Sequence, residues 1–314
     1  MITAPPLRDE RVGLLFAAGA AILYGAAYPA TAIALRSFSP LGVAALACTL
    51  ALPIVIGLAA AGVLPRPTRA AANLASLWRL AVLALLGGLA FIAAVNIAIA
   101  LSGPTITGFV APLYAVAAAL LAIPILGERV RPVTVGAFVL ALLGTALLAG
   151  VDPAATTLTG VAMALGAAVL FGLYIVLARR WGRRYALDGT LVTIANLISR
   201  GPILLLIELV RAPSELIPAS PEPAAVVALL SIAIGSSSTA NLMLMASVRR
   251  VPAGRASAAL LLTPVSSAVI GVVLLGERLP AIGVVGAFLI LIGIAVASGA
   301  LHGRLRGRER PLAP

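Results

Sequence analysis

Long apolar runs separated by short polar connections occupy the chain from about residue 12 to residue 300. A helix needs about 20 apolar residues to cross the hydrocarbon of a bilayer. Ten runs are long enough, and they cover residues 12–35, 41–62, 77–100, 104–125, 132–150, 158–178, 187–210, 223–246, 253–274 and 281–300. Open sheet is excluded because its edge amides would have no partners in lipid. The pattern therefore predicts an all-α integral membrane protein with ten transmembrane helices.

The composition agrees with a membrane protein and argues against several kinds of chemistry. Hydrophobic residues make up 62% of the chain and charged residues 10%, where soluble domains carry about 25% charged residues. Cys48 is the only cysteine, and the only histidine, His302, lies in the C-terminal tail. These counts leave no cysteine pair for a disulfide and no cysteine or histidine cluster for a metal. We therefore expect no metal site and no cofactor.

The basic residues are sorted along the chain. All 22 are arginine, and the net charge is +12, which by itself could indicate a nucleic-acid partner. If the N-terminus is cytoplasmic, however, 18 arginines fall in the inside segments and only Arg36, Arg211 and Arg278 fall outside. Arginine retained on the inside is the usual topology signal of membrane proteins. The distribution predicts cytoplasmic termini, a cytoplasmic arginine-rich tail at 301–314 and no nucleic-acid partner.

Three short motifs recur in the same order in the two halves of the chain. They are Gly-Ala-Ala-Ile-Leu-Tyr-Gly at 19–25 and Gly-Ala-Ala-Val-Leu-Phe-Gly at 166–172, Leu-Gly-Glu-Arg at 126–129 and 275–278, and Gly-Ala-Phe at 136–138 and 286–288. Each half, 12–150 and 158–300, contains five predicted spans. Because five is odd, the second half must enter the membrane in the opposite sense. Inverted repeats of this kind are typical of transporters with a binding site at the midplane.

On these motifs the chain resembles the EamA-like family of the drug/metabolite transporter superfamily. The stretch from Tyr24 to Tyr28 in span 1 and the stretch from Ala100 to Pro104 before span 4 add to the resemblance. It implies two EamA-like repeats, at 12–150 and 158–300. It also implies efflux of small metabolites or drugs across a bacterial-type cell (inner) membrane. Many members carry an arginine near the middle of span 2, where residues 45–49 of this chain have none.

A mid-span arginine is found instead in span 7. Arg200 lies near the centre of 187–210, and Thr193, Asn196 and Arg200 share one face of a helix because they are three and four residues apart. A charge at this depth is costly unless it faces protein or water. We expect Arg200, Asn196 and Thr193 to bind an anionic or zwitterionic substrate. The alternative is a structural arginine bonded to backbone carbonyls or to a glutamate.

Other polar residues of the predicted spans are further candidates for substrate binding. They are Asn96, Asn241, Ser237, Tyr28 and Tyr114. Buried asparagine and tyrosine side chains need hydrogen-bond partners, and they suit a polar cavity that holds an organic molecule. Hydrogen bonds between helices and aromatic packing remain the alternative explanation for these residues.

Glu208 is the carboxylate that lies well inside a predicted span, about 12 Å along the axis from Arg200. It is the candidate for ion coupling, because a carboxyl group buried in protein can exchange protons near neutral pH. The alternative is a partner for Arg211.

These observations favour a secondary transporter that moves small organic molecules, such as amino acids or drugs, by alternating access. An uncoupled facilitator is the first alternative, since in-span carboxylates are scarce. A membrane-embedded enzyme is disfavoured, because no span contains His, the one in-span aspartate, Asp188, lies at the very start of 187–210, and we identify no catalytic residue. The expected partners are the small-molecule substrate and the lipid bilayer. The sequence does not specify the oligomeric state.

Overall fold

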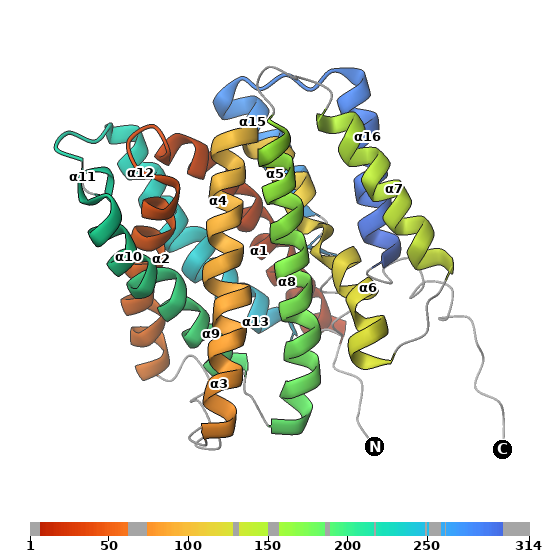
Figure 1. Cartoon of the computed structure of the whole chain (residues 1–314), viewed down its shortest axis with the longest axis horizontal. Helices are drawn as coiled ribbons and strands as arrows, with labels where there is room; N and C mark the ends of the chain where they lie inside the picture. The colour runs from red at the N-terminus through yellow and green to blue at the C-terminus, as the bar shows by residue number, and fades with distance from the viewer. Residues whose placement is uncertain are drawn as a thin grey trace.

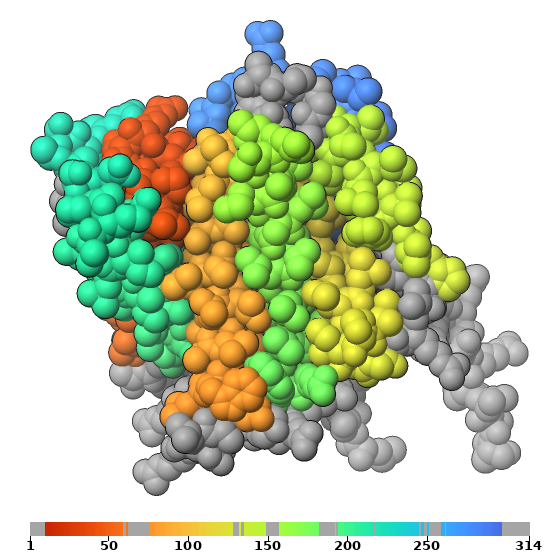
Figure 2. Space-filling view, viewed as in Figure 1, coloured from red at the N-terminus to blue at the C-terminus, as the bar shows by residue number. Residues whose placement is uncertain are grey.

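A computed structural model describes residues 7–61, 74–127, 132–149, 157–185, 189–216, 218–248, 250, 259–260 and 262–297. These described residues form helices joined by short turns and contain no β-strand. Figure 1 shows the helices packed as one bundle, with α7 (Pro132–Ala149) and α16 (Ala281–Ala297) at one edge. Helices α10 (Leu204–Arg211), α11 (Pro213–Leu216) and α12 (Pro223–Ser231) lie at the opposite edge. Across the middle of one face, α4 (Phe91–Ser102), α8 (Leu158–Tyr185) and α6 (Tyr114–Leu126) pack side by side (Figure 2).

Six helical stretches are long and apolar enough to cross a membrane. They are Glu10–Ala34, Pro40–Leu58, Ser76–Ser102, Pro104–Leu126, Leu158–Trp181 and Pro223–Leu244, and they match the first four, the sixth and the eighth predicted spans. The fifth, ninth and tenth predicted spans correspond to the shorter apolar stretches Val135–Leu148, Leu262–Leu275 and Ala281–Val296. The seventh corresponds to three consecutive segments. The chain is thus a multi-pass helical membrane protein, and the count of ten remains a prediction.

The bounds of the helices of the first half are as follows. They are α1 (Leu7–Ala34), α2 (Pro40–Ala60), α3 (Leu74–Leu83), η2 (Ala84–Ala90), α4 (Phe91–Ser102), α5 (Pro104–Val110), η3 (Ala111–Leu113), α6 (Tyr114–Leu126) and α7 (Pro132–Ala149). Segment η2 is a π-helical turn and η3 a 3₁₀ turn. Together α3, η2 and α4 form one long continuous helix with a π-helical segment, and α5, η3 and α6 form another with a 3₁₀ turn.

The second half contains the remaining helices. They are α8 (Leu158–Tyr185), α9 (Gly189–Ile198), η4 (Ser199–Ile203), α10 (Leu204–Arg211), α11 (Pro213–Leu216), α12 (Pro223–Ser231), η5 (Ile232–Ala240), α13 (Asn241–Val248), α15 (Leu262–Leu275) and α16 (Ala281–Ala297). Segments η4 and η5 are π-helical, so the seventh and eighth predicted spans both widen near their middles.

Corresponding helices of the two halves run antiparallel where they meet. The hydroxyl of Ser39, which precedes α2, donates to Glu208 of α10. Further along α2, Thr49 lies against Gly201 of η4, which precedes α10. The two helical stretches therefore run in opposite directions. In α7 and α16 a Cβ on Gly144 would lie 2.5 Å from the Gly286 oxygen. A Cβ on Gly293 would lie 2.8 Å from the Ala137 oxygen. Antiparallel pairing of matched helices is the arrangement that an inverted repeat requires.

Three prolines lie within predicted spans, and all three are accommodated in helical structure. Pro112 lies in the 3₁₀ turn η3, where the hydrogen-bond pattern of the fourth predicted span changes. Pro29 lies inside α1, which continues through it to Ala34. Pro264 lies in the first turn of α15, where its missing N–H leaves no helical hydrogen bond unmade.

Candidate functional site

A cavity of about 470 Å³ lies in the bundle, within the usual size range of small-molecule sites. Its lining comes from both halves of the chain: α1, α2, α4, η3 and α6 from the first half, and α8, α9, η4, η5, α13 and α15 from the second. Helices α7 and α16 contribute no lining residue within the described part of the chain. The cavity thus lies at the seam between the two halves, and the α7–α16 pair lies outside it.

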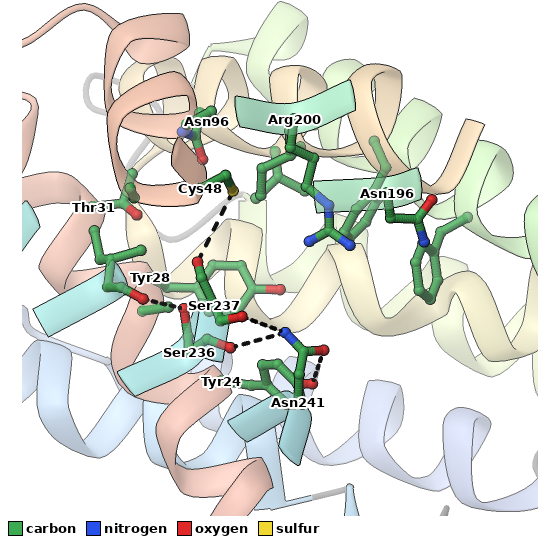
Figure 3. A pocket seen from close by; sticks show the side chains of 18 of the residues that line it. Tyr24, Tyr28, Thr31, Cys48, Asn96, Asn196, Arg200, Ser236, Ser237 and Asn241 are labelled. Atoms are coloured by element: carbon green, nitrogen blue, oxygen red, sulfur yellow. Dashed lines mark hydrogen bonds between the residues drawn. The ribbon is translucent and has the colours of Figure 1, made fainter. Parts of the chain in front are cut away.

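Seven of the eight substrate-binding candidates line this cavity. They are Arg200, Asn196, Asn241, Asn96, Tyr28, Tyr114 and Ser237. Several of them are shown in Figure 3, where they converge from different helices. The eighth, Thr193, belongs to α9, and its side chain lies outside the described part of the structure. Residues separated by more than 200 positions in the sequence are therefore brought together in one hollow.

Arg200 projects from the π-helical segment η4 and is partly buried. Its Nε has no hydrogen-bond partner among the described residues. Figure 3 shows the side chain reaching from its helix toward the side of the cavity that holds Ser237 and Asn241. A buried guanidinium N–H without a protein partner is costly, and a ligand oxygen or water would satisfy it. Among the described residues that line the cavity, Arg200 alone carries a charge.

Asn241 joins the first helix to the eighth predicted span. Its Oδ1 accepts a hydrogen bond from the Tyr24 hydroxyl at 2.8 Å. Its Nδ2 donates to the carbonyl oxygens of Ser237 at 2.9 Å and Ser236 at 3.3 Å, both in η5 (Figure 3). Because the amide is held at both ends, it fixes the shape of the wall rather than offering a free group to a ligand.

The other two asparagines are also tied to neighbouring helices. The Nδ2 of Asn96 donates to the carbonyl of Pro40 at 2.9 Å, so α4 is bonded to the start of α2. Asn196 donates to the Tyr174 hydroxyl at 3.4 Å, while its buried Oδ1 has no partner among the described residues. Much of the hydrogen-bonding capacity of these amides is therefore used between helices. This is the alternative role that the sequence indicates for them.

Four aromatic rings form a cluster in the wall of the cavity. The ring of Phe171 lies 4.5 Å from Phe91, 4.9 Å from Tyr114 and 5.0 Å from Tyr174 between centroids, and all four rings line the cavity. The three partner rings are tilted by 37°, 65° and 36° to the plane of Phe171, and such tilted and edge-on pairs stabilise each other. The cluster gives one wall of the cavity an aromatic character.

Sequence reasoning overlooked part of this lining. Phe91 and Phe171 are indistinguishable by sequence from other apolar residues of their spans, although Phe171 lies in the second copy of the first repeat motif, at 166–172. Cys48 also lines the cavity, with its Sγ 4.0 Å from the Ser237 Oγ. It lies in the span 2 stretch where family members carry arginine, and Gly201 packs against that stretch. Arg200 thus approaches the same level of α2 from the partner helix.

Glu208, the coupling candidate, does not line the cavity. Its carboxylate is fully buried and accepts hydrogen bonds from the Ser39 hydroxyl at 2.7 Å and the Arg211 Nε at 2.8 Å. The structure therefore contains the Arg211 pairing that the sequence offered as the alternative to coupling. Glu277, near the end of α15, accepts a hydrogen bond from the Thr105 hydroxyl of α5. Its repeat equivalent, Glu128, lies outside the described residues.

Comparison with known proteins places the chain in a family. The EamA-like transporter family matches residues 11–150 and again residues 158–299. No curated protein matches the sequence. Among solved structures 27 chains match. One of them, described as a crystal structure of a protein, superposes on this chain with a TM-score of 0.66 and 22% sequence identity. The match covers 93% of this chain and 98% of that one. The fold is thus shared with a solved protein, and this chain belongs to the EamA-like transporter family of membrane transporters.

Proposed function

We propose that this protein is a secondary transporter that exports small organic molecules across a bacterial-type cell membrane by alternating access. The observation that carries the proposal is the cavity at the seam of the two halves, lined by both and containing Arg200. A site at such a seam can face each side of the membrane in turn if the halves rock against one another.

The proposed topology has ten spans in two inverted five-helix repeats, with both termini in the cytoplasm. The distribution of arginines supports it, and so do the antiparallel contacts between matched helices, such as Gly144 with Gly286. The paired aromatic rings of Trp78 and Trp181, 5.3 Å apart, would lie at the cytoplasmic interface, where indole rings are favoured.

Transport by the purified protein in liposomes tests the proposal. Vesicles would be loaded with a mixture of unlabelled amino acids and organic acids, and counterflow of each labelled solute would be measured. We expect Arg200→Gln to lower the counterflow at least about tenfold, because a hydrogen bond to a charged group contributes about 1.5–3 kcal/mol. Arg211→Gln is the matched control, since Arg211 lies outside the cavity and is largely exposed. Counterflow unchanged by Arg200→Gln in correctly folded protein would remove Arg200 from the site.

An uncoupled facilitator is the second candidate function. It is favoured by the lining of the cavity, because the described residues there include no carboxylate that could carry a proton. Repeating uptake with and without an imposed pH gradient separates the two mechanisms. Accumulation above equilibrium that requires the gradient supports coupled transport. Equilibration at the same rate and to the same level in both conditions supports the facilitator.

A further inference from the structure

We infer that the cavity selects aromatic organic anions and discriminates against both cations and zwitterions of the same shape. The inference deepens the proposed function and rests on it, since it concerns the same cavity. It depends on two independent features of the lining: the sign of its charge and the cluster of aromatic rings.

The charge of the cavity comes from one guanidinium. Arg200 is the charged residue among the described lining residues, and the uncharged polar groups around it are amides, hydroxyls and a thiol. The nearest acidic side chain on the same continuous helix is Glu208, which bonds to Ser39 and Arg211 outside the cavity. A carboxylate ligand therefore neutralises the site. An ammonium ligand adds a second positive charge beside Arg200, which is unfavourable.

The neutral acceptors of the cavity can bond an ammonium group but cannot offset its charge. Asn241 Oδ1 already accepts from Tyr24, and the carbonyls of Ser236 and Ser237 accept from Asn241. The buried Asn196 Oδ1 has no partner among the described residues, and the hydroxyls of Tyr28 and Tyr114 also line the cavity. Because none of these acceptors is anionic, a zwitterion or a cation brings a positive charge that the lining does not compensate.

The aromatic lining of the cavity favours a ligand that carries a ring. Phe171 lies at the centre of the aromatic cluster, with the rings of Phe91, Tyr114 and Tyr174 within 5.0 Å of its own. A ligand ring packed against this cluster gains more than a flexible chain of equal length, because aromatic pairs contribute beyond the area they bury. A carboxylate held at Arg200 and a ring packed against the cluster account for both features.

Binding to the purified full-length protein, measured by titration calorimetry, tests the inference. The probes form a matched series: 3-phenylpropionate, phenylalanine, phenethylamine, and hexanoate as an anion without a ring. We expect 3-phenylpropionate to bind at least about tenfold more tightly than phenylalanine, phenethylamine not to bind, and hexanoate to bind more weakly than 3-phenylpropionate. Equal or tighter binding of phenylalanine, or no binding of 3-phenylpropionate by folded protein, overturns the inference.

Two variants test which residue produces each binding preference. Arg200→Gln should abolish the preference for 3-phenylpropionate over phenethylamine. Phe171→Leu should weaken 3-phenylpropionate by several-fold and hexanoate by clearly less, since the loss of the ring pair affects the aromatic ligand alone. A thermal unfolding scan of each variant establishes that it is folded, and a folded variant that keeps the wild-type preferences contradicts the inference. Counterflow distinguishes failure of this inference from failure of the proposed function. Counterflow of zwitterions that depends on Arg200 would contradict the inference but not the transport function. Absence of any counterflow by the wild-type protein would contradict the transport function itself.

Discussion

At the scale of the residue, Arg200 is energetically costly to bury in a membrane, so its position indicates a functional or structural need for the charge. An arginine at the centre of a membrane helix costs at least about 2.5–3.5 kcal/mol on insertion scales. The protein supplies a cavity but no acidic partner among the described lining residues, and the Nε is unpartnered there. The sequence identified this residue because a charge within an apolar run stands out. It could not identify Phe91 and Phe171, because whether an apolar side chain faces lipid or a cavity depends on tertiary packing.

Glu208 gives a second prediction at the scale of the residue, and it concerns stability rather than transport. Glu208→Gln should lower the melting temperature of the purified protein by a few degrees, because the hydrogen bonds from Ser39 and Arg211 to a charged carboxylate are weakened. Each such bond contributes about 1.5–3 kcal/mol, less where the partner is exposed. Scanning fluorimetry measures the effect.

Ser39→Ala is the control for this prediction. If the two residues act through one bond, the double variant should lose less stability than the sum of the single variants. Counterflow by the folded Glu208→Gln variant should keep the pH response of the wild type. Loss of that response with unchanged stability would restore Glu208 as the coupling residue.

At the scale of the element, the pairing of α7 with α16 depends on glycine. A Cβ on Gly144 would lie 2.5 Å from the carbonyl oxygen of Gly286 and 2.9 Å from the Ile290 nitrogen, so Gly144→Ala must push the helices apart. We expect this variant to lower the melting temperature, since overpacking costs roughly 1–3 kcal/mol. Gly136→Ala, in the same helix with open space at the Cβ position, is the control and should be neutral. Equal melting temperatures for the two variants would contradict the close packing.

Hydropathy and length predicted where most helices lie to within a few residues, because lipid imposes the length of a span. They did not predict the π-helical segments η2, η4 and η5, since these depend on contacts made after folding. Ser199 in η4 donates to the Ala84 carbonyl of η2 at 2.8 Å, so two of the segments bond to one another. In η5 the Ser238 hydroxyl reaches the carbonyl five residues earlier, at Ala233. Such widened turns are frequent at functional sites, and η4 and η5 both line the cavity.

At the scale of the whole molecule, the account depends on two halves of one chain that lie in opposite senses with a cavity between them. The repeat motifs and the arginine distribution predicted this arrangement from the sequence. The cavity is lined by residues of both halves. No sequence motif predicts its position, because the position depends on how the helices pack against one another. In the proposed mechanism, opposite orientation of the halves would let the site open to each side of the membrane in turn.

Cysteine labelling in whole cells tests this claim most directly. The arginine that closes each Leu-Gly-Glu-Arg motif would be replaced, as Arg129→Cys and separately as Arg278→Cys, in a Cys48→Ser background that removes the native thiol. The account predicts that a membrane-impermeant maleimide labels the 278 variant in intact cells and the 129 variant only after the membrane is permeabilised. Labelling of both variants from the same side would contradict the inverted repeat and the transport mechanism built on it.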